Sequence, residues 1–470
     1  MKIKLITILS VIILSSFLSC GGGGGSGDSG SEDGIISTVP WAWISGSELQ
    51  NQPGVYGTKG TPDPANIPGA RSGGVCWTDS SGNIWLFGGK GYDSTGNQGY
   101  LNDLWKFDGT AWTWVSGSNT ISQNGEYGTK GTAAAANVPG ARSGCVCLKD
   151  SSENIWIFGG MGYADTGSTR DLNDLWKFNG TNWTWVSGGK VGNEYGTYGT
   201  KGTAAAANVP GARENSTGWI DSSNHIWIFG GTGQAVSPDS GYLNDLWKFD
   251  GTNWTWVSGS NQSEQFGVYG TKGTAAAVNI PGSRGRSTGW IDSDGNLWLF
   301  GGSVRVSVVT HEVGNYNDLW KFNTTDLTWT WISGSNTLHQ AGVYGTLGVA
   351  SHSNIPGARE NSISWVDSDG NFLLFGGLGA DSSNYDGTLN DLWKFDGTDW
   401  IWISGSRKRT QNGVYGTQGV SSKSNIPDAR SESTGCIDSD GNLWIFGGKW
   451  VNYVDDTTGL YNDLWKCELN

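Results

Sequence analysis

Short apolar runs, separated by turns rich in Gly, Asn and Asp, recur along the whole chain. In one copy they occupy residues 143–149, 155–158, 175–178 and 183–186, and Asn179-Gly180 joins the last two. Runs of this length bounded by turn residues predict β-strands. An Asn-Gly pair between two such runs predicts a two-residue hairpin, because both central positions of that turn need a positive φ. Each copy is therefore expected to form four antiparallel strands.

The same pattern returns with a period near 71 residues. A Gly-Gly pair follows the second run at 88–89, 159–160, 230–231, 301–302, 376–377 and 447–448. An Asn-Asp-Leu-Trp block begins at 102, 173, 244, 317, 390 and 462. This self-similarity predicts a repeat architecture, and four short antiparallel strands per repeat are typical of one β-propeller blade. We expect the second strand to end at the Gly-Gly pair, where a larger side chain would block the backbone.

Each repeat has three landmarks, which are an Arg entering the first strand, the Gly-Gly pair after the second, and a Trp in the fourth. With these landmarks, residues 41–470 resemble a series of kelch repeats. The resemblance implies an all-β, six-bladed kelch-type propeller of a bacterial lipoprotein. The repeats exceed the roughly 50 residues usual for kelch units. The surplus lies between each Trp-x-Trp and the next Arg, a spacing of 28 residues in every copy, and this constant length predicts an ordered connection.

The two ends of the chain complement each other. The last Asn-Asp-Leu-Trp block, at 462–465, has no Trp-x-Trp after it, whereas Trp41-Ala42-Trp43 stands 28 residues before Arg71 with no block ahead of it. We therefore expect residues 41–45 to pair with the strand at 464–467 and to complete the last blade. This pairing would close the ring and remove two exposed sheet edges.

The N-terminal segment predicts export and a lipid anchor. Residues 1–19 contain two Lys followed by an apolar run, as in a secretory signal peptide. Cys20 follows Phe17-Leu18-Ser19, which resembles the lipobox of bacterial lipoproteins, so Cys20 is the expected lipidation site. Residues 20–40 are expected to be a flexible Gly/Ser tether that precedes the propeller at 41–470. Gly21, which replaces the Asp of inner-membrane retention, favours the outer membrane of the bacterial envelope.

Composition and charge limit the kinds of molecule that are expected to bind this chain. The formal net charge is −14, so nucleic acid and anionic lipid are not expected to bind, and membrane contact is expected through the lipid anchor only. The 28 Trp residues can build a large aromatic core. Cys76 and Cys147 occupy equivalent positions that hold Gly or Ser in the other repeats, so a small residue is expected there. Free buried thiols and a disulfide between these two both remain open, and we expect a monomer.

Two sets of repeated residues are candidate ligand-binding residues on the face that carries the long connections. A ring of guanidinium groups could hold a carboxylate or sulfate, whereas in the kelch family this Arg usually braces loops. The Arg set is Arg71, Arg142, Arg213, Arg284, Arg359 and Arg430. The Tyr set lies in the long connections and is Tyr56, Tyr127, Tyr198, Tyr269, Tyr344 and Tyr415.

Metal sites and cofactors are not expected. The Asp-x-Asp-Gly-Asn turns at 292–296, 367–371 and 438–442 lack the further carboxylate of a calcium loop, so they are interpreted as hairpin turns. His311, His339 and His352 are expected in one sector of the long-connection face, but their spacing does not demand a metal. No residue set matches the copper site of galactose oxidase, a kelch-like enzyme of known copper chemistry.

The sequence favours a binding or interaction module of the envelope, whose ligand is a glycan or a protein loop. An enzyme acting on carbohydrate, either an oxidase or a sugar mutarotase, is the alternative. Glu214, Glu360 and Glu432, which lie close to their Arg residues, leave room for proton transfer to a sugar. A structural envelope protein without a specific ligand is the third possibility.

Overall fold

The computed structural model describes residues 36–306, 312–452 and 457–469. This part of the chain consists of strands, turns and loops, and it contains no helix, so none that could span a membrane. The predicted signal peptide, Cys20 and most of the predicted tether lie outside the described residues. The last residues of the tether segment include β1 (Ile36–Ser37), which pairs with β30 at Gly405 and Ser404.

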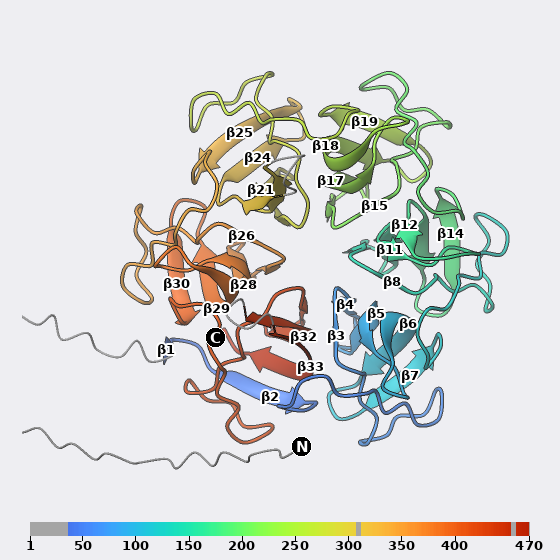
Figure 1. Cartoon of the computed structure of the whole chain (residues 1–470), viewed down its shortest axis with the longest axis vertical. Coiled ribbons are helices and arrows are strands. Elements are labelled where there is room, and N and C mark those ends of the chain that lie inside the picture. The colour runs from blue at the N-terminus through green and yellow to red at the C-terminus, as the bar shows by residue number, and fades with distance from the viewer. Residues whose placement is uncertain (1–35, 307–311, 453–456, 470) are drawn as a thin grey trace, which may run out of the picture. The chain divides into compact units, whose positions relative to one another are not determined.

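The strands follow the repeats in order (Figure 1). Those of the first three repeats are β3 (Arg71–Ser72), β4 (Val75–Thr78), β5 (Ile84–Tyr92), β6 (Gln98–Phe107), β7 (Trp112–Ser116), β8 (Arg142–Ser143), β9 (Val146–Lys149), β10 (Ile155–Phe158), β11 (Met161–Gly162), β12 (Arg170–Asp171), β13 (Leu175–Phe178), β14 (Trp183–Ser187), β15 (Arg213–Glu214), β16 (Thr217–Ile220), β17 (Ile226–Gln234), β18 (Ser240–Phe249) and β19 (Trp254–Ser258).

Those of the last three repeats are β20 (Thr288–Ile291), β21 (Leu297–Phe300), β22 (Ser303–Arg305), β23 (Val313–Asn315), β24 (Leu319–Asn323), β25 (Thr328–Ser333), β26 (Arg359–Glu360), β27 (Ile363–Val366), β28 (Phe372–Ala380), β29 (Asp386–Phe395), β30 (Trp400–Gly405), β31 (Thr434–Ile437), β32 (Leu443–Asn452) and β33 (Thr457–Cys467). The remaining strand, β2 (Trp41–Ser45), precedes the first repeat in the chain.

Antiparallel pairing within each repeat agrees with the four predicted strands. In the second repeat the order is β9-β10-β13-β14, with Trp156 opposite Lys177 and Trp176 opposite Trp185. A small second sheet, β12-β11-β8, was not predicted. The prediction that the second strand ends at Gly-Gly holds for β10 and β21 but is wrong for the longer β5, β17, β28 and β32. These strands continue through the glycines with a register shift, so the pair forms a bulge rather than an end.

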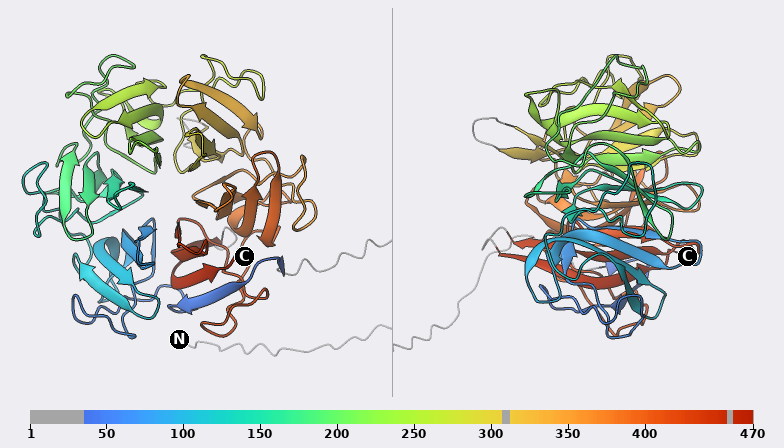
Figure 2. Two further views of the ribbon diagram at one scale, coloured as in Figure 1. Left: turned by 180° about the vertical axis from the view of Figure 1, so that it is seen from behind. Right: turned by 90° about the vertical axis from the view of Figure 1, so that its right-hand side faces the viewer.

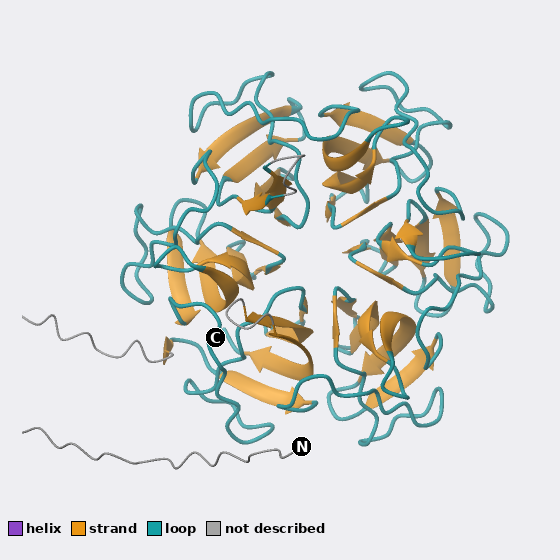
Figure 3. Cartoon of the chain, viewed as in Figure 1, coloured by secondary structure: helices purple, strands orange, loops and turns teal. Residues whose placement is uncertain are grey.

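The sheets of successive repeats lie side by side around a common axis, an all-β arrangement consistent with a propeller (Figures 1 and 2). The strands of each repeat are arranged around the centre, and loops lie on the outer rim (Figure 3). Strand β2 pairs antiparallel with β33, and places Trp41 opposite Cys467 and Trp43 opposite Trp465. Thus the N-terminal strand hydrogen-bonds to the C-terminal strand, as the Trp-x-Trp spacing predicts.

The hydrophobic core is divided into clusters that each join consecutive repeats. In one of them Val75 and Trp77 of the first repeat pack with Ile155 and Ile157 of the second. Another joins the last repeat to the first, and packs Phe446 and Leu464 against Leu86 and Trp105. Indole and phenyl rings dominate these clusters, so the repeats stabilise one another chiefly through apolar burial.

The long connections are ordered, as their constant length predicts, and they cover the outer sheet edges. The connection before Arg71 forms backbone hydrogen bonds from Gly60 N–H to Trp114 O, at 2.8 Å, and from Asp63 N–H to Trp112 O, at 3.3 Å. Asn66 Nδ2 donates to Trp112 O as well, at 2.9 Å. Because an open edge strand is a template for aggregation, we attribute much of the added repeat length to this cover.

Candidate functional site

The six predicted Arg residues are part of a buried polar cluster that every repeat contains. In the first repeat, Arg71 donates from both terminal nitrogens to the Asp103 carboxylate, at 2.7 Å each. Tyr56 Oη and Trp105 Nε1 also donate to Asp103 Oδ2, at 2.6 and 2.7 Å. We call this set of Arg, Asp, Tyr and Trp the repeat node. The six carboxylates at its centre are Asp103, Asp174, Asp245, Asp318, Asp391 and Asp463.

The repeat node buries its arginines and engages all three nitrogens of each guanidinium in hydrogen bonds within the protein. Arg71 is 2% exposed and the other five are 1% exposed or less. In the first repeat, Arg71 Nε donates to Gly69 O and Nη1 to Gly88 O, so the guanidinium also ties the long connection to the bulge of β5. A fully hydrogen-bonded buried ion pair of this kind is strongly destabilised when one partner is removed. The contacts favour the bracing interpretation over ligand binding for all six.

The six predicted Tyr residues belong to the same node. Four of them are buried, and Tyr269 and Tyr415 are partly buried. Each hydroxyl donates to its node Asp at 2.6 to 2.7 Å. Burial, together with the Asp103 carboxylate, raises the pKa of Tyr56 far above its ordinary value, which keeps the donated proton on the phenol. The Tyr set therefore anchors the long connections, and the surface available to a ligand lies elsewhere.

The residues that follow each node Arg form a closed backbone ring around the axis. The second residue after the Arg donates its N–H to the carbonyl of the equivalent residue in the preceding repeat, at 2.8 to 3.2 Å in all six cases. The series includes Gly73 N–H to Glu432 O, which joins the first repeat to the last. We call these positions the axial ring, and they are Gly73, Gly144, Asn215, Arg286, Asn361 and Glu432.

Every axial-ring residue has a positive φ, between 54° and 64°. Gly takes this left-handed conformation freely and Asn tolerates it, which suits four of the six positions. Arg286 and Glu432, at 60° and 54°, are long charged residues that pay a conformational cost there. Strain of this kind clusters at functional sites. Residues such as Glu264, Leu327 and Thr410 share the positive φ, so the axial ring is a candidate site because its two strained residues also line a pocket.

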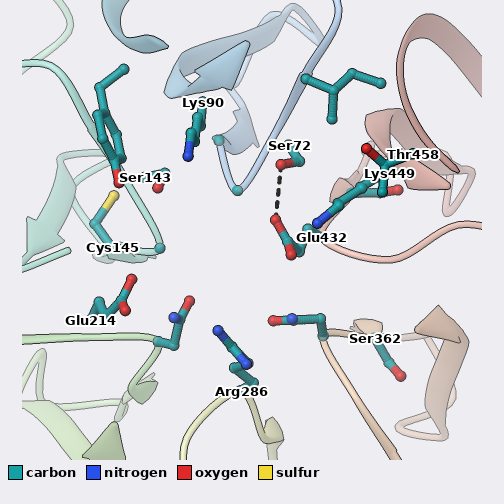
Figure 4. A pocket seen from close by; sticks show the side chains of 18 of the residues that line it. Ser72, Lys90, Ser143, Cys145, Glu214, Arg286, Ser362, Glu432, Lys449 and Thr458 are labelled. Atoms are coloured by element: carbon teal, nitrogen blue, oxygen red, sulfur yellow. Dashed lines mark hydrogen bonds between the residues drawn. The ribbon is translucent and has the colours of Figure 1, made fainter. Parts of the chain in front are cut away.

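A polar pocket of about 450 Å³ lies over the axial ring (Figure 4). Its walls come from residues that follow the long connections, such as Ser72, and from residues beside the loop between the second and third strands, such as Lys90 near the end of β5 and Gln98 at the start of β6. Lys90 and Glu432 lie across the pocket from Arg286 (Figure 4). The pocket is therefore on the face predicted for ligand binding, although different residues line it.

The charged side chains at this pocket differ in the partners that they have. Arg286 Nη1 lies 3.3 Å from Glu360 Oε2, and Ser72 Oγ donates to Glu432 Oε2 at 2.8 Å. Lys90 Nζ lies 5.5 Å from the centre of the Tyr100 ring, so the two side chains form a cation–π contact. Both carboxylates named here thus have partners, and Glu214 lies on the wall of the same pocket.

Glu214 is the pocket's most perturbed carboxyl group. Burial, followed by the nearby Asp171 carboxylate, raises its pKa to about 7, although Arg286 acts in the opposite direction. Burial also raises the pKa of Asp171 to about 6, and Asp171 Oδ1 lacks a hydrogen-bond partner among the described residues. A carboxyl group with a pKa near neutrality can both donate and accept a proton at physiological pH. This property makes Glu214 the best candidate for acid–base chemistry.

The Asp-x-Asp-Gly-Asn turns fit the hairpin interpretation. In the turn at 292–296, Asp292 Oδ1 accepts hydrogen bonds from the N–H groups of Asp294 and Asn296, at 3.1 and 2.8 Å. Its Oδ2 accepts from Trp298 Nε1 at 2.9 Å. These donors lower the pKa of Asp292 and occupy the oxygens that a calcium ion would need.

The prediction that three His residues share one sector is wrong for the two that can be assessed. His339 Nδ1 lies 3.4 Å from Asp386 at the start of β29, whereas His352 Nδ1 lies 2.7 Å from Asp399 just before β30. Because β29 ends at Phe395, these partners mark opposite ends of the sheet. His311 lies outside the described residues, and no cluster of metal ligands occurs in the part that is described.

Sequence reasoning noted Glu214, Glu360 and Glu432 but missed Arg286 and Lys90. The available signal was variation among the repeats, because the position two residues after the constant Arg changes from Gly to Asn, Arg or Glu.

Comparison with known proteins leaves the family open. No protein-family model and no curated protein matches the chain. Among solved structures, "Structure of YjhT" is similar to 85% of this chain and 95% of its own, with 13% sequence identity and a TM-score of 0.48.

Proposed function

We propose that this chain is a lipid-anchored binding module of the bacterial envelope, and that its axial pocket takes a small polyhydroxylated ligand such as the terminal unit of a glycan. The observation that supports this proposal best is the pair Arg286 and Glu432, two charged residues held at positive φ beside a pocket. Neither residue is required by the backbone, since Gly or Asn fills the same position elsewhere. Their conformational cost is best explained by contact with a ligand.

The lining of the pocket supports a ligand rich in hydroxyl groups. Its volume, about 450 Å³, lies within the range of small-molecule sites. Hydroxyl, amide, carboxylate and ammonium groups alternate around it, from residues such as Ser143, Asn215, Glu214 and Lys90. Sugars present closely spaced donors and acceptors that such a set can satisfy. A protein loop would have to enter the same polar space, and we make it an alternative outcome of the test below.

We also propose the finer architecture that the repeats imply, a six-bladed kelch-type propeller closed by residues 41–45. The pairing of β2 with β33 and the hydrogen bond from Gly73 to Glu432 support closure. The predicted signal peptide and Cys20 support display from the envelope, with the outer membrane favoured.

A second candidate function is proton transfer to a bound sugar, as in a mutarotase. The pKa of Glu214, raised to about 7, supports it, because the carboxyl group could protonate one sugar oxygen and accept a proton from another at neutral pH. Arg286 would then stabilise negative charge on the ligand.

The test combines a glycan array with isothermal titration of the sugars it identifies, and metal content is measured in parallel. We expect the parent to bind and Arg286→Gln to lose at least tenfold in affinity, with little change in melting temperature. Glu126→Gln, an exposed carboxyl group outside the pocket, is the matched control. If no sugar binds but a peptide library does, the ligand is a protein loop; if neither binds, a structural envelope protein is favoured.

Proton NMR of any sugar that binds tests whether the protein is an enzyme or only a binding module. Catalysis would be established if the parent accelerates the exchange between anomers of the sugar and Glu214→Gln abolishes this acceleration. The variant must still bind the sugar with the parent's affinity. Unchanged exchange with the parent would leave binding as the function.

A further inference from the structure

Neighbouring repeats meet at two fixed positions of their first strands, five and six residues after the node Arg. The sixth residue is bulky in five repeats. The sixth residues are Trp77, Leu148, Trp219, Trp290, Trp365 and Cys436. The fifth residues are Cys76, Cys147, Gly218, Gly289, Ser364 and Gly435.

The sixth residue of one repeat faces the fifth residue of the next. A Cβ atom added to Gly289 would lie 2.8 Å from Trp219 Nε1, and one added to Gly435 would lie 2.7 Å from the Trp365 ring. A bulky sixth residue therefore requires a small residue opposite it. Only in the last repeat is the sixth residue itself small, and the residue that faces it is in the first repeat.

That contact brings two thiols together. Cys436 is buried in the cluster that joins the last repeat to the first, and Cys76 packs against the same cluster. The strands that carry them, β4 and β31, lie against each other, and both thiols are free. Cys147 packs instead in the next cluster with Val75 and Trp77. Because successive residues of a strand point to opposite faces, Cys76 points away from Val75 and Trp77. Cys436 is thus better placed than Cys147 to react with Cys76.

We propose that Cys76 and Cys436 form a disulfide that links the first and last repeats. One thiol, as thiolate, attacks a disulfide oxidant of the thiol–disulfide exchange class and gives a mixed disulfide, and the second thiol then displaces the oxidant. The two thiols lose two protons and two electrons, and the oxidant leaves as two thiols. An exported protein meets such oxidants, so this inference depends on the export in the proposed function but not on ligand binding.

The bond would act on the unfolded chain. It closes a loop of 360 residues, from position 76 to position 436, and the entropy lost by the unfolded chain grows with loop length. The neighbouring Cys76, followed by burial, raises the pKa of Cys436 well above its ordinary value, so the Cys436 thiol reacts slowly in the folded protein. The bond is therefore expected to form during folding, once the two thiols have met and before the surrounding cluster has packed fully around them.

The test refolds the full chain from denaturant in a glutathione and glutathione disulfide mixture, with a reduced sample alongside. Remaining thiols are alkylated, and the digest is mapped without reduction. We expect a peptide that links Cys76 to Cys436, and a melting temperature higher than that of the reduced protein by roughly 5 °C or more.

Two variants separate this bond from its alternatives. Cys436→Ser should remove both the linked peptide and the oxidant-dependent shift, whereas Cys147→Ser should keep both. If Cys436→Ser does not fold, the peptide map of the parent still decides. A link from Cys76 to Cys147, or full alkylation of Cys76 after oxidative refolding, would overturn the proposal. Because refolding needs neither export nor a ligand, failure here is distinct from failure of the proposed function.

Discussion

The repeat node and the axial ring lie only two residues apart in every repeat, yet the first is chemically uniform and the second is not. All six nodes contain the same Arg, Asp, Tyr and Trp with nearly the same distances, from 2.6 to 2.9 Å. The axial ring keeps one backbone conformation but presents Gly, Asn, Arg or Glu. Residues that are the same in all six repeats are those that every repeat needs in order to fold.

This difference separates scaffold from site. A position that the fold fixes must hold a residue that satisfies the same buried partners in each repeat, as Asp103 and its counterparts do. A position that only has to continue the backbone is free to vary, and a ligand at the centre of a ring touches each repeat from a different direction. We therefore expect changes at the node to alter stability, and changes at Arg286 or Glu214 to alter binding.

The largest expected effect on the scaffold side comes from deleting residues 41–45. The deletion removes Trp41, whose side chain is fully buried, and leaves β33 without its outer partner. We expect aggregation, or a fall in melting temperature of more than 10 °C, because a long sheet edge and an apolar cluster become exposed. Differential scanning calorimetry and light scattering measure the two effects. A truncated chain that melts like the parent would show that β2 is dispensable.

Substituting one node Arg should have the next largest effect. Arg213→Gln leaves Asp245 buried without its ion-pair partner, and we expect a loss of about 3–5 kcal/mol in the free energy of unfolding. Urea denaturation measures it. Lys149→Gln, which removes a partly exposed pair with Glu153, is the control and should cost less than about 1 kcal/mol. Normal stability combined with lost ligand binding would return the node Arg to the list of binding residues.

The periodic parts of the structure were the ones that the sequence could predict. Four strands per repeat, and the pairing of residues 41–45 with the last strand, follow from apolar runs and constant spacing. The continuation of β5 through Gly88 and Gly89 did not, because glycine can either end a strand or form a bulge. The pair itself does not decide between the two, since the same Gly-Gly ends β10 and β21 and forms a bulge in β5, β17, β28 and β32.

The candidate site was only partly predictable. The six Arg and six Tyr were singled out because they recur, but recurrence also results from a buried node, and burial is a tertiary property. Their common partner, the Asp of Asn-Asp-Leu-Trp, was visible in the sequence without being linked to them. Conversely, Arg286 was not singled out from the sequence, and its positive φ and its place on the pocket wall are what mark it as a candidate.

The pH dependence of stability tests whether Glu214, at the pocket over the axial ring, titrates with a raised pKa. The pKa of Glu214 rises from an ordinary value of 4.5 to about 7 on folding, so between these values the folded protein holds a proton that the unfolded chain has lost. The free energy of unfolding should therefore fall as the pH rises from 4.5 to 7, by about 1–3 kcal/mol from this group. Asp171, whose pKa rises from 3.8 to about 6, acts in the same direction.

Glu214→Gln should reduce that fall, while Glu126→Gln should leave it unchanged. Urea denaturation at pH 5 and at pH 8 measures the difference for each variant. An identical pH dependence in the parent and Glu214→Gln would mean that Glu214 titrates normally, and it would remove the main support for proton transfer.

The smallest expected effect concerns the outer rim, where uniformity is incomplete. Lys130 Nζ lies 4.3 Å from the centre of the Trp185 ring, and equivalent pairs occur in three other repeats. The fifth and sixth repeats have Leu347 and Gln418 at the Lys position, so the fold does not depend on the cation. Lys130→Leu should therefore cost only about 0.5–1 kcal/mol, as for an exposed cation–π pair. A double-mutant cycle with Trp185→Leu measures the coupling, and a value above about 2 kcal/mol would place this pair with the node, among the contacts that the fold requires.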